Sequence, residues 1–185
     1  MFQNIYNNSA NLNGNIRNSS ASRIIPFHNT DVTSKSYVDS KVKERALKLT
    51  NTLVANVNTL TSTAYNGLNT TPDLDTFGTD LTISTSSITF NITGNFLCTF
   101  NFYLTSAVVR PNVLFRFAIN GVEQIGRSAH NYIRGSAGHQ EASSCLTELL
   151  YIRSGDVLTI THLRVAAAGI VESPASTGLV QVIEL

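Results

Sequence analysis

The residues that could do acid–base or nucleophilic chemistry are few and widely spaced in this 185-residue chain. An active site needs an acid, a base or a nucleophile that converge on one position. Asp156 lies in a Ser-Gly-Asp turn, where its expected role is to accept hydrogen bonds from backbone N–H groups. Glu148 falls within an otherwise apolar stretch and could pair with an arginine at a subunit interface. This distribution of carboxylates does not predict catalysis.

The cysteines and histidines offer the remaining chemistry. Cys98 alternates with large apolar residues, so we expect a buried free thiol, although spacing alone leaves one bridge to Cys145 open. A Cys–His pair of the kind that activates a thiol nucleophile is not visible. His130, His139 and His162 have no second ligand at zinc spacing, and the alternative is one histidine from each chain of a trimer. We therefore predict a non-enzymatic protein without metal or cofactor.

Composition argues against nucleic-acid and membrane partners. The formal net charge is +1 and charged residues make up 14% of the chain, so we expect no basic surface. No apolar run approaches the roughly 20 residues of a membrane-spanning helix. The first residues lack the basic start and apolar region of a signal peptide. Ser, Thr and Asn together form about a third of the residues, which favours a β-sheet surface coated with hydroxyls and amides.

Residues 80–185 carry the signature of a β-sandwich. From Phe96 to Leu104 every second side chain is apolar, which is the period of a strand with one face in a core. The same alternation precedes Asn120-Gly121, a strong hairpin signal. Two long connections, 128–143 and 166–177, interrupt the pattern. We expect strands over 80–85, 87–93, 95–105, 113–120, 122–127, 144–153, 156–165 and 178–184.

Residues 33–64 have a different pattern, with apolar side chains three or four residues apart. Val38, Leu49 and Leu60 recur every 11 residues, which keeps a seam on one side of a nearly straight helix. We therefore predict an α-helical coiled-coil stalk that associates as a trimer. The alternative is that this segment packs along its own sandwich. The predicted seam residues are Val38, Val42, Leu49, Leu53, Val57 and Leu60.

The segments on either side of the predicted helix lack a regular period. Residues 1–32 are rich in Asn and contain scattered apolar residues, so we predict an extended arm that anchors the protein to another protein; a disordered tail is the alternative. Residues 65–79 contain Asn-Gly and Pro and are predicted to form a neck. The predicted anchoring residues are Phe2, Ile5, Tyr6, Ile24, Ile25 and Phe27.

The strand region also carries a spaced series of aromatic, aliphatic and turn residues. The series is Phe96-x-x-x-Phe100-x-Phe102, then Phe117-x-Ile119-Asn120-Gly121, then Leu150-x-Ile152-x-x-Gly155-Asp156. Over residues 87–185 it resembles the complement globular-head and tumour-necrosis-factor-like (TNF-like) superfamily. The resemblance implies a jelly-roll β-sandwich that forms a tight homotrimer through aromatic-rich inner faces. The collagen-like Gly-x-y stalk common in secreted complement-type members is absent from this sequence.

The opening of the predicted stalk resembles a second group of proteins. Lys35, Tyr37, Val38 and Asp39 match the x-x-K-x-Tyr-Val-Asp element of phage tail-fibre and related viral fibre proteins. This resemblance implies a homotrimeric fibre or spike on the virion surface, with the arm held by a capsid or tail protein and the head facing the host. The alternatives are a soluble trimeric recognition or signalling ligand and a capsid decoration without a receptor.

The connection 128–143 is the predicted host contact. It places His, Tyr, Arg and Gln side chains among Gly and Ser, as adaptable binding loops do. The bound surface would be a receptor or a glycan. The alternative is an ordinary connection whose Tyr and Ile pack on a neighbouring subunit. The predicted contact residues are His130, Asn131, Tyr132, Arg134, His139 and Gln140.

Overall fold

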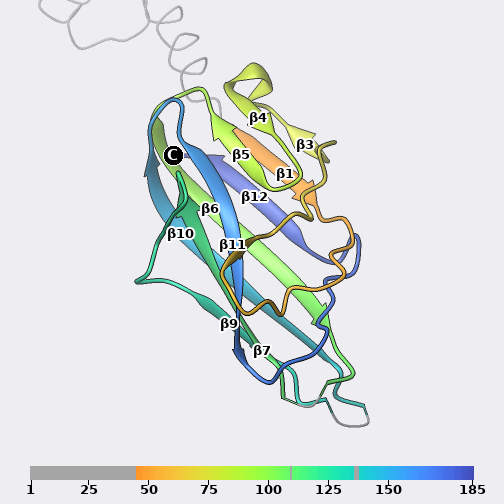
Figure 1. Cartoon of the computed structure of the whole chain (residues 1–185). Helices are drawn as coiled ribbons and strands as arrows, with labels where there is room; N and C mark the ends of the chain where they lie inside the picture. Colours follow the sequence, from red (N-terminus) through yellow and green to blue (C-terminus); the bar gives the residue numbers. More distant parts are fainter. Residues whose placement is uncertain (1–44, 109, 136–137) are drawn as a thin grey trace, which may run out of the picture. The chain divides into compact units, whose positions relative to one another are not determined.

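The computed structural model describes residues 45–108, 110–135 and 138–185, which form a sandwich of two antiparallel sheets (Figure 1). The predictions for the arm 1–32, with its anchoring residues, lie outside the described residues. The same holds for the first part of the predicted helix, including Val38 and Val42. Everything described below belongs to one compact unit, which contains residues 45–185.

One sheet has five strands in the order β10-β6-β12-β1-β3. Its long central pair, β6 and β10, is in register over twelve residues, from Glu141 opposite Thr105 to Ile152 opposite Gly94. β1 pairs with β12 on the other side of β6. The strands are β1 (Ala46–Thr50), β3 (Leu74–Asp75), β6 (Gly94–Thr105), β10 (Glu141–Ile152) and β12 (Leu179–Glu184).

The other sheet has seven strands, with the order β4-β5-β11-β7-β8 along its main path. β2 also pairs with β11, and β9 with β7. A 3-10 turn, η2 (Gly78–Asp80), precedes β4. The strands are β2 (Thr63–Ala64), β4 (Leu81–Ile83), β5 (Ser87–Phe90), β7 (Asn112–Ile119), β8 (Val122–Glu123), β9 (Ala129–Tyr132) and β11 (Val157–Ala166).

The strands predicted after residue 80 are confirmed, most with shifts of one to three residues at their ends, although only Val122–Glu123 of the predicted strand 122–127 forms a strand. The side chains of β6 alternate between the core and the surface as predicted. The predicted Asn-Gly turn follows β7, with Asn120 and Gly121 both at positive φ. The connection 128–143 is more regular than expected. It contains β9 and the beginning of β10.

Aromatic side chains from both sheets fill the core. Phe100 and Phe102 of β6 pack on Phe115 of β7 with ring centroids 5.7 and 4.0 Å apart, and Tyr65 stacks on Phe100 at 5.2 Å. The aromatic-rich contacts between subunits that the resemblance implied do not involve the phenylalanines of β6 and β7. Phe96, Phe100, Phe102, Phe115 and Phe117 are all at most 2% exposed within one chain.

The helix predicted over 33–64 is wrong over residues 45–64. Ala46–Thr50 forms β1, in which Leu47 and Leu49 alternate into the core. The predicted seam residues therefore do not share one face: Leu49 and Val57 are fully buried, whereas Leu53 and Leu60 are 60% and 74% exposed. The described residues contain no helix that is long and apolar enough to span a membrane.

Residues 46–50 form a strand rather than a helix because the edge of β12 provides partners for their backbone hydrogen-bonding groups. Residues 50–63 are mostly Thr, Asn, Val and Ser, which are poor helix formers. The two leucines of β1 fit a period of two as well as a helical seam. All five residues of β1 pair with the edge of β12. This tertiary pairing selects the strand period of two over the helical period.

The predicted neck 65–79 packs into the same sandwich. Tyr65, Leu68 and Phe77 are at most 4% exposed. Asn51 fixes this region with its side-chain amide, which donates to Tyr65 Oη at 3.1 Å and accepts from the backbone N–H of Gly178 at 2.6 Å. The predicted neck is therefore part of the head rather than a separate linker.

The first and last described residues lie at the same end of the head. Arg45 is paired with Asp80 and, at 3.2 Å, with Glu184, and its guanidinium lies over the Phe77 ring at 5.1 Å. The backbone N–H of Glu184 donates to the carbonyl of Arg45 at 3.0 Å. In Figure 1 the C-terminus accordingly lies at one end, and the loops beside β7 and β9 lie at the other.

His162 is a buried structural residue of β11. It is 2% exposed, and its Nδ1 lies 3.1 Å from Thr59 Oγ1. Burial lowers the pKa of His162 below its ordinary 6.5, and a backbone hydrogen bond with Val57 opposes this shift in part. The side chain lies inside the sandwich, so it is not available as a metal ligand on a threefold axis.

Replacing Leu49 with Ala distinguishes the strand from the predicted stalk. We expect Leu49→Ala to lower the free energy of unfolding by about 2–5 kcal/mol, because it removes a fully buried side chain. Leu53→Ala should change it by no more than about 0.5 kcal/mol, because Leu53 is exposed. Urea titration of both variants measures this. Equal losses would contradict β1 and favour a helical seam.

The stability of the head should depend on pH through His162. Because the folded pKa of His162 is depressed, the unfolded chain takes up its proton first as the pH falls. The stability from neutral His162 is therefore present above about pH 6.5 and lost below it. His162→Gln should flatten the dependence of the unfolding free energy on pH between about pH 7.5 and the folded pKa. An unchanged slope in that variant would show that His162 does not titrate differently in the two states.

Candidate functional site

Three connections meet at the end of the head that lies away from Arg45 and Leu185. Their described residues are 106–108 and 110–111 after β6, 133–135 and 138–140 after β9, and 167–178 after β11. Backbone N–H groups of Thr105 and Ser106 donate to the carbonyls of Glu172 and Gln140, each at 2.9 Å. Ser106 Oγ also donates to the carbonyl of Ile170 at 2.7 Å. These bonds hold the three connections together as one surface, which we call the distal surface.

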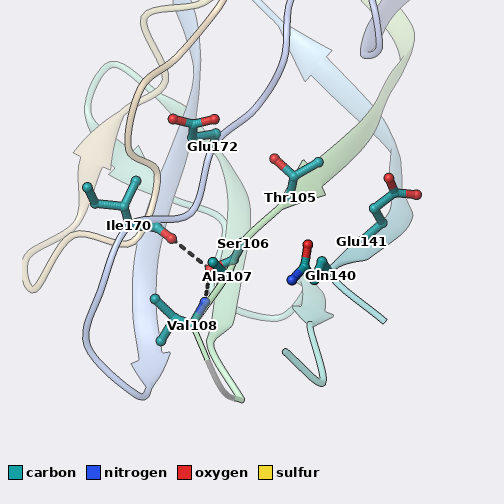
Figure 2. A pocket seen from close by; sticks show the side chains of 8 residues that line it. All are labelled: Thr105, Ser106, Ala107, Val108, Gln140, Glu141, Ile170 and Glu172. Atoms are coloured by element: carbon teal, nitrogen blue, oxygen red, sulfur yellow. Dashed lines mark hydrogen bonds between the residues drawn. The ribbon is translucent and has the colours of Figure 1, made fainter. Parts of the chain in front are cut away.

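The distal surface contains a hollow of about 560 Å³ (Figure 2). Glu141 and Glu172 line it with carboxylates and Gln140 with an amide, while Val108 and Ile170 provide an apolar wall. The described residues contain no group of three potential metal ligands here or elsewhere. The hollow can accept hydrogen bonds from hydroxyl or amino groups and can pack against an apolar face of the same ligand.

The predicted contact residues divide between this surface and its flank. Gln140 lines the hollow, His139 is exposed next to it in the chain, and Arg134 is exposed earlier in the same connection. His130 is exposed on β9, and Tyr132 is 52% exposed at the end of the same strand. All five side chains are therefore accessible from solvent in one chain.

Asn131 differs from the other predicted contact residues. It is 2% exposed, and its side-chain amide donates to the carbonyl of Ala142 at 3.3 Å, which joins β9 to β10. The next inward-facing residue, Ile133, is fully buried in the core of its own chain rather than against a neighbouring subunit. Inward and outward side chains alternate along β9 and into residue 133, which explains why Asn131 and Ile133 are buried. This alternation is too short to be recognised from sequence.

A second exposed surface was missed by sequence reasoning. On the outward side of the five-stranded sheet, Leu149, Leu97, Ile183 and Ala46 lie opposite one another on β10, β6, β12 and β1. Leu149 is 54% exposed. We call this row the apolar row. It depends on the register of four strands, so no local sequence signal could have revealed it.

The turn residue Asp156 has the structural role expected of it. Its Oδ2 accepts from the backbone N–H of Arg153 at 2.8 Å, and its Oδ1 accepts from Asn120 Nδ2 at 2.7 Å. These bonds, the one from Arg153 first, lower the pKa of Asp156. Asp156 therefore joins two turns at the end of the head opposite the distal surface.

The free thiols also take positions without catalytic partners among the described residues. Cys98 is buried in β6, where burial and the nearby Glu148 raise its pKa to about 12. Cys145 is exposed on the outward face of β10, and its Sγ lies 3.3 Å from Thr147 Oγ1. The two cysteines are unbridged.

Comparison with known proteins identifies the fold. No family model and no curated protein sequence matches the chain. A structure of mouse APRIL at pH 8.5 matches with a TM-score of 0.50 and 13% identity, covering 77% of this chain and 100% of that chain. Eiger TNF from S. frugiperda matches with a TM-score of 0.53 and 13% identity, covering 77% and 92%. The head is therefore a mainly β sandwich with a TNF-like jelly-roll fold, as the spaced motifs had implied.

Proposed function

We propose that this chain is the head-bearing subunit of a non-enzymatic homotrimeric fibre or spike on a virion. Its jelly-roll head presents the distal surface for attachment to a host. The observation that carries the proposal is the apolar row on the outward face of the five-stranded sheet. The orientation of the head relative to the particle, and the location of the protein on a virion, rest on other observations.

The apolar row favours self-association. A sheet face in contact with water is normally polar, whereas this row crosses four strands with aliphatic side chains. Tyr151, 59% exposed, adds to it on β10. A stable interface typically buries about 1,000 Å² or more of total surface, and its centre is more apolar than its rim. The resemblance to the TNF-like superfamily makes a homotrimer the expected assembly.

The two ends of the head favour a directional attachment protein. Any segment before Arg45 joins the head beside Glu184, whereas the distal surface lies at the other end of β6. Twelve residues of β6 separate the two ends by about 37 Å. An arm held by a capsid or tail protein would therefore leave the distal surface facing outward.

The virion setting rests on the likeness of Lys35–Asp39 to the fibre element. A soluble trimeric ligand is the second candidate, and the likeness of the head to Eiger TNF favours it. Asn91 distinguishes the two, because it begins an Asn-Ile-Thr acceptor for N-linked glycan and is exposed. Mass spectrometry of the natural protein decides: a glycan on Asn91 favours the ligand, and copurification with particles favours the fibre.

A charge in the apolar row should break the trimer. We expect Leu149→Asp to convert the full chain from trimer to monomer in sedimentation equilibrium at micromolar concentration, because a buried unpaired carboxylate is costly. The fold should survive, since Leu149 is 54% exposed. Val165→Asp is the matched control, because Val165 is 50% exposed on the other sheet. If both variants remain trimeric, the row is not the interface.

Attachment should depend on the flank of the distal surface. We expect particles that carry Tyr132→Ala together with Arg134→Ala to adsorb to their host cells at least about fivefold more weakly, which corresponds to a loss of about 1 kcal/mol of binding free energy. The matched control is Arg153→Ala, an exposed arginine at the opposite end. Unchanged adsorption of the double variant would argue for a decoration protein or for another contact surface.

A further inference from the structure

The hollow of the distal surface is built on a row of three outward-facing side chains. Thr105 of β6 lies opposite Glu141 of β10 on one side and opposite Glu172 on the other. Residues that lie opposite each other in antiparallel strands share a face, with Cβ atoms about 5 Å apart. The Cβ atoms of the two glutamates are therefore about 10 Å apart with Thr105 between them, as Figure 2 shows.

The two carboxylates of this row form no ion pair with a described cation. The ion pairs of the described residues involve neither Glu141 nor Glu172. The residues that line the hollow include no Lys, Arg or His, and Arg110, Arg134 and His139 are exposed on the same connections without lining it. The hollow therefore presents negative hydrogen-bond acceptors to a ligand.

Glu141 keeps most of its capacity to accept hydrogen bonds. A hydrogen bond with Glu141 raises the pKa of Tyr103, whose hydroxyl is thus one donor to this carboxylate. A carboxylate can accept about four hydrogen bonds through its two oxygens. Glu141 can therefore accept further hydrogen bonds from a ligand in the hollow.

One wall of the hollow is apolar and is held in place by backbone hydrogen bonds. Ile170 is 60% exposed, and Val108 is partly buried. Ser106 joins the two connections that carry them, because its Oγ donates to the carbonyl of Ile170 at 2.7 Å and accepts from the N–H of Val108 at 3.0 Å. The aliphatic side chains are therefore positioned in the same hollow as the carboxylates.

A sugar ring has both of the surfaces that this lining requires. The hydroxyl groups at its edge donate hydrogen bonds, and those to a carboxylate are stronger than those between neutral groups. The C–H groups on its face pack against aliphatic side chains. Gln140 adds an amide that can donate to a hydroxyl or accept from one. The volume of about 560 Å³ falls in the range of pockets that hold small organic ligands.

An extended peptide fits the hollow less well than a sugar does. Thr105 and Glu172 already exchange two backbone hydrogen bonds at 2.9 Å, and the N–H of Ser106 donates to the carbonyl of Gln140. A peptide that adds to a sheet needs a free strand edge, and these paired groups do not provide one. A basic side chain alone could still reach the carboxylates, so the test includes a basic peptide.

We propose that the hollow binds a saccharide unit of the host surface that carries neighbouring hydroxyl groups and no acidic group. Glu141 and Glu172 accept hydrogen bonds from its hydroxyls, and the face of the ring packs on Val108 and Ile170. A sialylated or sulfated sugar is excluded, because its negative charge would lie against two carboxylates without a paired cation. This inference rests on the host attachment of the proposed function and names the chemical class of the ligand.

The saccharide site and the apolar row are separate parts of the same sheet face. Leu97 of the row precedes Thr105 by eight residues on β6, which corresponds to about 26 Å along the strand. Association through the row therefore leaves the hollow at the end of the head.

The test is binding of the purified full chain to an array of immobilised neutral, sialylated and sulfated oligosaccharides. We expect binding to neutral members only. For the neutral oligosaccharide that binds best, Glu141→Gln and Glu172→Gln should each raise the dissociation constant about tenfold in titration calorimetry, because neutral acceptors replace charged ones. Asp73→Asn is the matched control and should change nothing, since Asp73 is an exposed carboxylate outside the hollow.

A change in selectivity separates recognition from a structural role of the two glutamates. The double variant Glu141→Gln with Glu172→Gln removes the repulsion of acidic sugars. The preference for the neutral oligosaccharide over its sialylated form should therefore fall by at least about tenfold. A merely structural role would weaken both forms equally, and that result would overturn the proposal. Both substitutions keep the shape of the side chain, and circular dichroism checks that each variant is folded.

Failure of the saccharide site can be told apart from failure of the proposed function. Binding to no neutral oligosaccharide, a preference for acidic ones, or binding of an oligolysine peptide in their place would each overturn the saccharide site. If particles still adsorb to host cells in these cases, the attachment function holds and another surface makes the contact. If the chain is absent from particles, the proposed function fails, whereas selective binding on the array would still support the saccharide site.

Discussion

The antiparallel pairing of β1 with β12 is the constraint on which the rest of the head depends. It extends the five-stranded sheet beyond β12, and it sets the register in which Ala46 continues the apolar row. Arg45 fixes one end of this pairing through Asp80 and Glu184, and Asn51 fixes the other through Tyr65 and Gly178. Without β1, the edge of β12 and part of the core would be open to solvent.

This arrangement gives the two faces of one sheet separate roles. The inward residues of β6 and β10 complete an aromatic core within a single chain, so the core does not need a partner. The outward residues are then free to form an association surface. Because the strands run the length of the head, the surface proposed for assembly lies along its side and the distal surface at its end. The proposed assembly and the proposed recognition therefore use different residues.

Most of the sheet could be predicted from sequence, because long strands such as β6 and β7 repeat the period of two many times. β1 could not, because Leu47 and Leu49 fit a strand and a helix equally and only the edge of β12 decides between them. The contact residues predicted on 128–143 were chosen by residue type, yet Asn131 is buried in the four-residue strand β9. The apolar row depends on the register of distant strands, which no local pattern records.

The mass of the full chain in solution tests the central claim most directly. Self-association through the apolar row predicts a species of three times the 20.1 kDa chain mass in sedimentation equilibrium at micromolar concentration. It should persist at high salt, because burial of apolar surface is not screened by ions. A single species of 20.1 kDa under the same conditions would contradict the account.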